Sequence, residues 1–107
     1  KKVSPGTDMA PITQEIYLLE AEGGETLVRT RHAQPLTDVR QLSELINAFE
    51  LLGFAQIHRS WAVNLRRVRE IRPAPEGGWE VKLDPPVNRV LPVSRRRVSA
   101  LWERFGE

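Results

Sequence analysis

Few side chains in this sequence could catalyse a reaction or bind a metal. There are two histidines, His32 and His58, and no cysteine, so disulfides, thiolate zinc sites and iron–sulfur clusters are excluded. Neither histidine has a second ligand at metal-site spacing. A relay of Ser60, His58 and Asp84 is disfavoured because adjacent strand residues point to opposite faces. The residues therefore predict no enzyme, no metal and no cofactor.

Arginine is the residue type whose number and placement point to a partner. Residues 1–50 carry five basic and eight acidic side chains, whereas residues 51–107 carry eleven and six, and ten of those eleven are arginine. The planar guanidinium matches phosphate oxygens and guanine edges better than the lysine ammonium does. Basic surfaces that only face solvent are also common. Charge therefore makes nucleic acid a candidate partner without deciding the matter.

Length and composition limit the chain to one domain of the soluble type. Its 107 residues suffice for one modest core, and 40% of them are hydrophobic and 28% charged. No run approaches the roughly 18 apolar residues that span a bilayer, and the first residues lack the apolar core of a signal peptide. The absence of cysteine fits a cytoplasmic location. We interpret residues 1–8 as a linker remnant and residues 9–107 as the domain.

Short strands separated by turns are predicted over most of the chain. Residues 15–21 and 26–31 are β-prone runs on either side of Gly23-Gly24, a pattern typical of a hairpin. After residue 53 the sequence changes to short β-prone runs broken by glycine and proline. These predict further strands at residues 54–59, 61–65, 68–72, 79–83 and 89–93.

Two helices are predicted among these strands. The first follows apolar residues spaced three and four apart, with Thr37 or Asp38 as its cap and Gly53 at its end. Its apolar stripe comprises Val39, Leu42, Leu45, Ile46, Phe49 and Leu52. In the second, Ser94 caps a short helix closed by Gly106. Its expected buried stripe comprises Val98, Leu101, Trp102 and Phe105.

Three motifs in the chain resemble one known family. They are Ile57-His58-Arg59-Ser60-Trp61-x-Val63-Asn64-Leu65, then Leu91-Pro92-Val93-Ser94-Arg95, and near the start Leu19-Glu20-Ala21-Glu22-Gly23. In this order and spacing, over about residues 9–106, the sequence resembles the LytTR family of DNA-binding domains. The resemblance implies a mostly β fold: an elongated stack of three small antiparallel β-sheets with one central and one C-terminal α-helix. It also implies loops that enter successive major grooves of bent DNA.

The resemblance assigns base contacts to three loops. It places Arg59, between two strands, and Arg95, at the start of the last helix, among the residues that reach base edges. For both, the alternative is an ordinary surface charge. The family's hairpin contact falls around Glu25 and Thr26, and we predict Thr26 because a carboxylate is unfavourable beside phosphates. This hairpin departs from the family pattern, with Gly24 and Glu25 in place of an Asn and an aromatic residue.

Other residues are predicted to contact the DNA backbone or to support the loops. Ser60 could donate to a phosphate or cap its own loop. Four arginines next to the matched motifs are candidate phosphate contacts, namely Arg66, Arg67, Arg96 and Arg97. His58 is expected to pack or hydrogen-bond inside the loop that aims Arg59. Asn64 is expected to hold a turn through its side-chain amide.

The sequence thus predicts the output domain of a bacterial transcriptional regulator, of the response-regulator type found in two-component systems. The resemblance implies double-stranded DNA with direct repeats, bound by a homodimer or by two monomers. It also implies an upstream sensor or receiver domain, and no membrane contact by this domain. The alternative is a protein-interaction module of the same fold that does not bind DNA. Single-stranded RNA binding needs exposed aromatic residues, whereas burial is expected for Trp61, Trp79 and Trp102.

Overall fold

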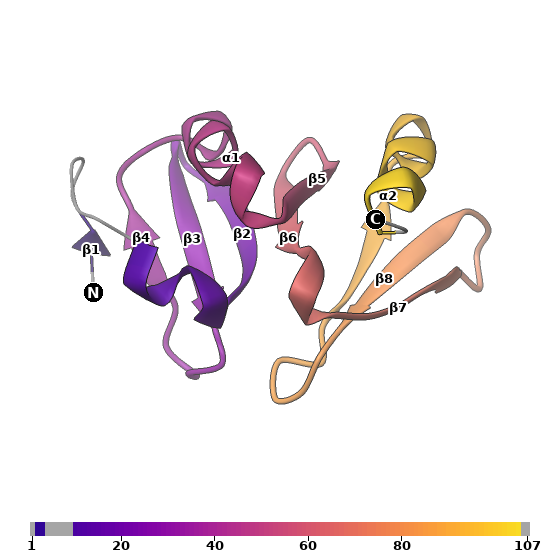
Figure 1. The fold of residues 1–107 in the computed structure, drawn as a ribbon, viewed down its shortest axis with the longest axis horizontal. Coiled ribbons are helices and arrows are strands. Elements are labelled where there is room, and N and C mark those ends of the chain that lie inside the picture. Colours follow the sequence, from indigo (N-terminus) through magenta and orange to yellow (C-terminus); the bar gives the residue numbers. More distant parts are fainter. Residues whose placement is uncertain (1, 4–9, 106–107) are drawn as a thin grey trace.

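The computed structural model, which describes residues 2–3 and 10–105, folds mainly into two β-sheets (Figure 1). The larger sheet has the strand order β1-β4-β3-β2-β6-β5, and its strands are Lys2–Val3 (β1), Ile16–Glu22 (β2), Glu25–Thr30 (β3), Leu36–Asp38 (β4), Phe54–His58 (β5) and Trp61–Asn64 (β6). The smaller has the order β7-β8-β9, with strands Val68–Pro73 (β7), Trp79–Leu83 (β8) and Val90–Val93 (β9). The edge strands β5 and β9 face each other, and each leads directly into a loop of the candidate site.

Strand β2 joins two hairpins into one sheet. It pairs antiparallel with β3 on one side and with β6 on the other, where Glu20 lies opposite Trp61. The structure therefore has two sheets where three small ones are expected, because β2 of the first hairpin also pairs with β6 of the second and so merges them. The expected mostly β architecture with one central and one C-terminal helix is confirmed.

Two apolar cores hold the layers together. One lies between the larger sheet and helix α1 (Leu42–Phe49), and the other lies between the two sheets and is closed by Leu101 of α2 (Val98–Phe105). Four short 3₁₀ turns connect the elements: η1 (Ala10–Glu15), η2 (Glu50–Leu52), η3 (Leu65–Arg67) and η4 (Arg95–Arg97). None of the helices in the described ranges is long and apolar enough to cross a membrane.

Helix α1 begins later than the sequence predicts. Its first turn is closed by the N–H of Gln41, which donates to Oε1 of Glu44 at 3.4 Å. The predicted caps Thr37 and Asp38 belong instead to β4, which pairs with β3. A strand of only three residues is too short to show a recognisable pattern in the sequence. Gly53 ends the segment as expected, with φ of 89° in the region that glycine favours.

Helix α2 is less buried than its apolar stripe predicts. Of its residues only Leu101 is buried, while Trp102 is 43% exposed and Phe105 38% exposed. Val98, one turn before Leu101, is half-buried against the same core between the sheets. The ring of Trp102 packs edge-on against Trp79, with centroids 5.5 Å apart. The expected burial of Trp102 is therefore wrong.

We expect Trp102→Ala to lower the free energy of unfolding by only about 1–2 kcal/mol, because almost half of the indole already faces water. Leu101→Ala removes a side chain that is 2% exposed and should cost about 2–4 kcal/mol. Urea denaturation followed by circular dichroism measures both values. A larger loss for Trp102→Ala than for Leu101→Ala would contradict this placement of α2.

The terminal predictions fall largely outside the described residues. Of the predicted linker, residues 1–8, only Lys2–Val3 is described, and it forms β1, which pairs parallel to β4. Gly106, the expected end of the last helix, also lies outside the described ranges.

Candidate functional site

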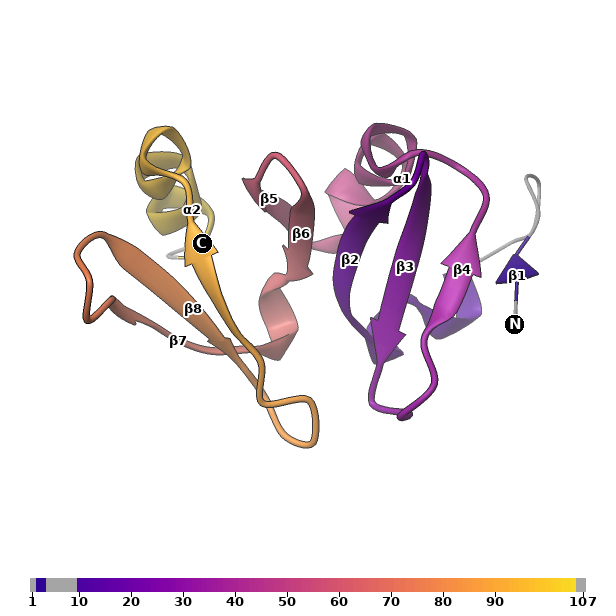
Figure 2. The same cartoon turned by 180° about the vertical axis from the view of Figure 1, so that it is seen from behind.

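Three loops lie at one end of the molecule: the β2–β3 turn, the β5–β6 turn and the connection from β9 to η4 (Figures 1 and 2). Backbone hydrogen bonds hold them side by side. The N–H of Ala21 donates to the carbonyl of Ser60 at 2.8 Å, and the N–H of Ser94 donates to the carbonyl of Ile57 at 2.8 Å. The sheets thus place segments far apart in the sequence on one surface.

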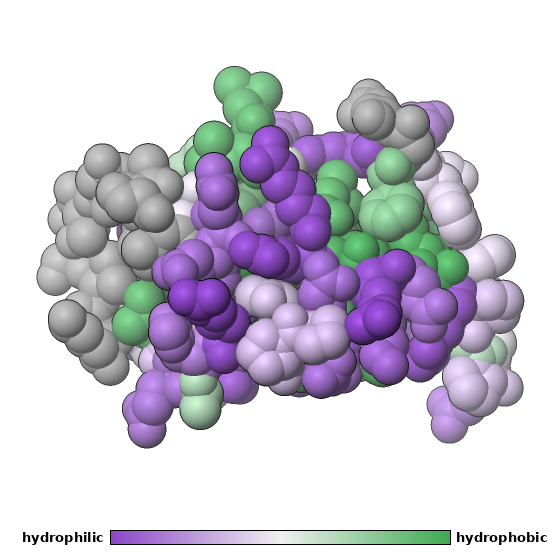
Figure 3. Space-filling model, turned by 60° about the horizontal axis from the view of Figure 1, so that its bottom comes forward, coloured by the Kyte–Doolittle hydropathy of each residue, from purple (hydrophilic) through white to green (hydrophobic). Residues whose placement is uncertain are grey.

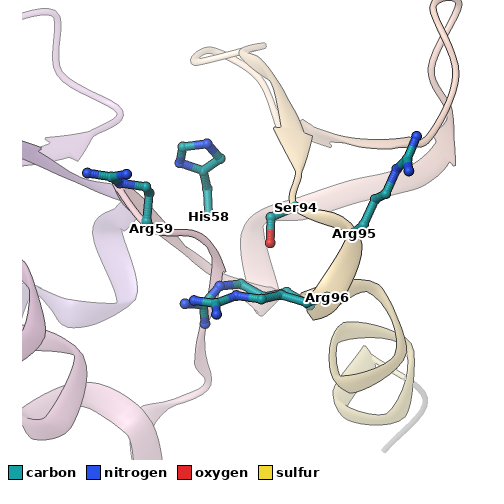
Figure 4. Close-up of a pocket in the computed structure, with 6 residues that line it drawn as sticks. His58, Arg59, Ser94, Arg95 and Arg96 are labelled. Atoms are coloured by element: carbon teal, nitrogen blue, oxygen red, sulfur yellow. The ribbon is translucent and has the colours of Figure 1, made fainter.

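The β5–β6 turn and the β9–η4 connection border a hollow of about 480 Å³ (Figure 4). It is lined by six residues, all of them in the two best-matched motifs or directly beside them: His58, Arg59, Ser94, Arg95, Arg96 and Arg97. In Figure 4 the side chains of Arg59 and Arg95 point away from each other, toward opposite sides of the hollow. The structure therefore gathers four predicted DNA-contacting arginines from two loops.

Within the part of the chain that the structure describes, the arginines of the hollow form no ion pair with a carboxylate. Among the residues that the structure describes, the ion pairs involve other arginines, namely Arg29, Arg31, Arg40, Arg72 and Arg89. No acidic residue lines the hollow. Four guanidinium groups that share a surface without a counter-charge create a positive potential that attracts anions. The basic character noted in the sequence is thus concentrated here, while other arginines serve the fold.

His58 shapes the turn that carries Arg59. Its Nδ1 accepts a hydrogen bond from the N–H of Ser60 at 3.1 Å, and its ring stacks on Trp61 with centroids 3.9 Å apart and an angle of 10°. The imidazole therefore spans the turn from one strand end to the other. Arg59, which lies between the bonded residues, is left exposed at the apex.

Two buried polar atoms border the hollow without a hydrogen-bond partner in the described structure: Oγ of Ser94 and Nε of Arg97. The sequence predicts that Ser94 caps the last helix through its side chain, and this is wrong. The segment begins instead as the 3₁₀ turn η4, in which the N–H of Arg97 donates to the backbone carbonyl of Ser94 at 3.0 Å. Buried polar atoms in proteins are usually hydrogen-bonded, so both atoms are unsatisfied groups beside the hollow, although neither is open to solvent.

Thr26 cannot be a base contact in this structure. It has no solvent-exposed surface, and its Oγ1 donates to the carbonyl of Arg40 at 2.9 Å. Side chains along β3 alternate, and Thr26 falls on the buried face of the strand, beside the buried Asp38 of β4. The exposed tip of this hairpin consists of Glu22 and two glycines. The prediction for Thr26 is therefore wrong, because the sequence does not reveal that Arg40, which follows β4, lies against this side chain.

Arg66 and Arg67 lie in η3, at the opposite end of β6 from Arg59 (Figure 1). The guanidinium of Arg67 donates twice to the backbone carbonyl of Gln14, at 3.0 and 2.7 Å, and lies over the ring of Tyr17. Arg67 therefore anchors the chain internally, whereas Arg66 is exposed, and the phosphate contact of either stays a prediction. Figure 3, which brings this lower end forward, shows a surface that is mostly hydrophilic.

Asn64 supports the chain at this same lower end. It is 1% exposed, its Nδ2 donates to the carbonyl of Ile16 at 2.9 Å, and its Oδ1 accepts from the N–H of Arg66 at 3.0 Å. The side-chain amide therefore holds a turn, as the sequence predicts. That turn is η3, on the far side of β6 from the loop of Arg59.

The two sheets are also linked away from the hollow. Glu20 of β2 accepts hydrogen bonds from Arg29 of β3 and from Arg89, which precedes β9. Burial alone would raise the pKa of the Glu20 carboxyl, but hydrogen bonds from Arg89 and Arg29 outweigh it and lower that pKa. Tyr17 adds a hydrogen bond from its hydroxyl to the carbonyl of Pro85 at 2.9 Å. These contacts keep the two halves of the site in a fixed relation.

Comparison with known proteins gives a consistent result. The model of a family described as the LytTr DNA-binding domain matches residues 10–106. The fold is similar to the solved LytTr DNA-binding domain of a putative methyl-accepting/DNA response regulator from Bacillus cereus, with a TM-score of 0.69 and 24% sequence identity. That match covers 88% of this chain and 84% of the other. No curated protein sequence matches the chain.

Proposed function

The chain belongs to the LytTr DNA-binding domain family, and from this premise we propose that the arginine-lined hollow reads the sequence of duplex DNA. The observation that carries the proposal is the set of four arginines that two loops bring to one end, where no carboxylate of residues 10–105 pairs with them. Backbone phosphates would supply the missing counter-charge, and guanine edges would accept bidentate hydrogen bonds.

The four arginines divide into two roles by position. Arg59 at the apex of its turn and Arg95 at the start of η4 are both exposed and point apart, so they suit base edges in two successive major grooves. Arg96 and Arg97 follow on η4 and suit phosphates, which fix the register of the protein without specifying sequence. Ser60 joins them as a phosphate donor. Contact in two grooves favours DNA that bends between them.

The domain then acts as the output part of a bacterial transcriptional regulator in the cytoplasm, without cofactor and without membrane contact. We propose that two copies, as a homodimer or as two monomers, occupy direct repeats, and that an upstream sensor or receiver domain controls them. DNA contact by the first hairpin is not part of this proposal, because its tip presents Glu22 and glycines and Thr26 is buried.

Salt dependence tests this function. If two to four arginines each neutralise a phosphate, log affinity falls with log salt at a slope of about −1.8 to −3.6, and affinity drops about 12- to 150-fold from 50 to 200 mM salt. The probe is a duplex that the domain itself selects from a random library, and fluorescence anisotropy measures its binding. An affinity that does not change with salt contradicts DNA binding and favours the protein-interaction alternative.

A pair of matched variants locates the phosphate contacts. Arg97→Ala should reduce the salt slope by about one, because one neutralised phosphate is lost. Arg66 is also a candidate phosphate contact in the sequence, but η3 places it outside the hollow, so Arg66→Ala should leave the slope unchanged. A reduced slope for Arg66→Ala and an unchanged slope for Arg97→Ala would place the DNA at η3 and contradict binding at the hollow.

A further inference from the structure

The facing edges of the two sheets meet at the base of the hollow. β5 is the last strand of the larger sheet and β9 the last strand of the smaller. The N–H of Ser94, directly after β9, donates to the carbonyl of Ile57 in β5 at 2.8 Å. Arg59 is two residues beyond Ile57, and Arg95 follows Ser94. The relative position of the two arginines therefore depends on how these two strand edges are joined.

Trp61 provides a second link across the same junction. Its Nε1–H donates to the carbonyl of Pro92 in β9 at 3.3 Å, while one face of its indole stacks on His58. His58 in turn accepts the hydrogen bond from Ser60 that closes the turn of Arg59. One side chain thus touches the support of one arginine loop and the strand that leads into the other.

We propose that Trp61 is a positioning residue, whose indole sets the spacing between Arg59 and Arg95 and thereby the spacing of the two bases they read. This inference rests on the proposed function. Arg59 and Arg95 point to opposite sides, so a small rotation of one loop against the other displaces the guanidinium groups relative to each other. Holding the loops before binding also reduces the ordering entropy that binding costs.

The stack and the N–H of Trp61 have separable effects. A phenylalanine ring can stack on His58 but has no donor for the carbonyl of Pro92. Trp61→Phe should therefore preserve the shape of the β5–β6 turn and release it from β9. Trp79 offers a matched control, because it is also a half-buried tryptophan with an aromatic contact, to Trp102, but makes no hydrogen bond across this junction.

The test measures the penalty for altered spacing. The probes are the duplex selected by the unaltered domain and the same duplex with one base pair inserted between the positions that Arg59 and Arg95 contact. The insertion moves one base by about 3.4 Å and rotates it by about 36°. The insertion should reduce the affinity of the parent domain by about 10-fold or more, because one bidentate contact is lost. Trp61→Phe should bind the selected duplex about 5-fold more weakly than the parent, and the insertion should reduce its affinity by less than about 3-fold. Trp79→Phe should behave as the parent with both duplexes.

Three results overturn the proposal in distinguishable ways. An insertion penalty for Trp61→Phe equal to that of the parent contradicts the positioning role alone. A parent that binds selected and random duplexes equally contradicts the proposed function, and the role of Trp61 with it. If Trp61→Phe does not fold by circular dichroism, benzothienylalanine at position 61 replaces it. This isostere keeps the ring and removes only the N–H, and a parental penalty in it overturns the role of Trp61.

Discussion

Arg59→Ala and Arg95→Ala are each expected to weaken binding to the selected duplex by about 1–3 kcal/mol, or roughly 5- to 160-fold. Arg59 and Arg95 are both exposed, border the hollow and form no ion pair with the described residues, so their removal should cost the proposed contact with DNA and little within the protein. The base preference should relax at one position for each variant. Anisotropy titrations on duplexes with every base at that position measure both effects.

Arg69→Ala is the control for this pair. Arg69 is an exposed arginine on β7 in the smaller sheet, outside the hollow, so its removal lowers the net charge equally. We expect its affinity for the selected duplex to stay within about two-fold of the parent at physiological salt, where distant charges are screened. If Arg59→Ala loses the same affinity for selected and random duplexes, Arg59 contacts phosphate and does not read a base.

Asp38→Asn is expected to lower the free energy of unfolding by about 3 kcal/mol, the largest effect on stability that we predict for a polar residue. The Asp38 side chain has no exposed surface and accepts hydrogen bonds from the N–H, Nε and NH2 of Arg40 at 2.9, 2.9 and 2.7 Å. Without the carboxylate, the guanidinium of Arg40, whose side chain is 21% exposed, loses its charged partner. Urea denaturation at neutral pH measures the change.

The Asp38 carboxylate also makes the free energy of unfolding depend on pH. Burial raises the pKa of Asp38, but hydrogen bonds from Arg40 outweigh burial and lower that pKa below its usual value. A lowered folded-state pKa stabilises the protein at pH values above the unfolded pKa, and this stabilisation is lost as pH falls through the folded pKa. Asp38→Asn should therefore lose less stability than the parent on acidification below about pH 4.

Glu76→Gln provides the comparison for Asp38. Glu76 is an exposed carboxylate in the β7–β8 turn, and its neutralisation should change stability by less than about 0.5 kcal/mol. An equal loss in the two variants would show that net charge, and not the Asp38–Arg40 pair, controls stability.

Local sequence patterns determined the elements and the two loops that matter most. Alternating apolar residues between glycine turns predict strands such as 79–83, which the structure reproduces as β8. Gly53 marks the end of the central helical segment because its φ of 89° suits glycine. Arg59 and Arg95 could be predicted as DNA contacts because each lies in a short motif that resembles the LytTR family. Such signals depend on neighbours within a few residues, which the sequence displays.

Tertiary contacts decided which side chains are free to act. Thr26 and Arg67 look available in the sequence, but Thr26 is covered where β3 pairs with β4, and Arg67 is held by a carbonyl 53 residues away. Trp102 fits an apolar stripe and is nevertheless 43% exposed, because α2 turns Leu101 and Val98 toward the core and leaves Trp102 at its margin, edge-on to Trp79. The hollow itself unites residues 58–59 with residues 94–97. Burial and pairing depend on residues distant in the chain. Composition and spacing therefore determined most strands and the basic motifs, and only the packing of the two sheets decided which arginines line one hollow.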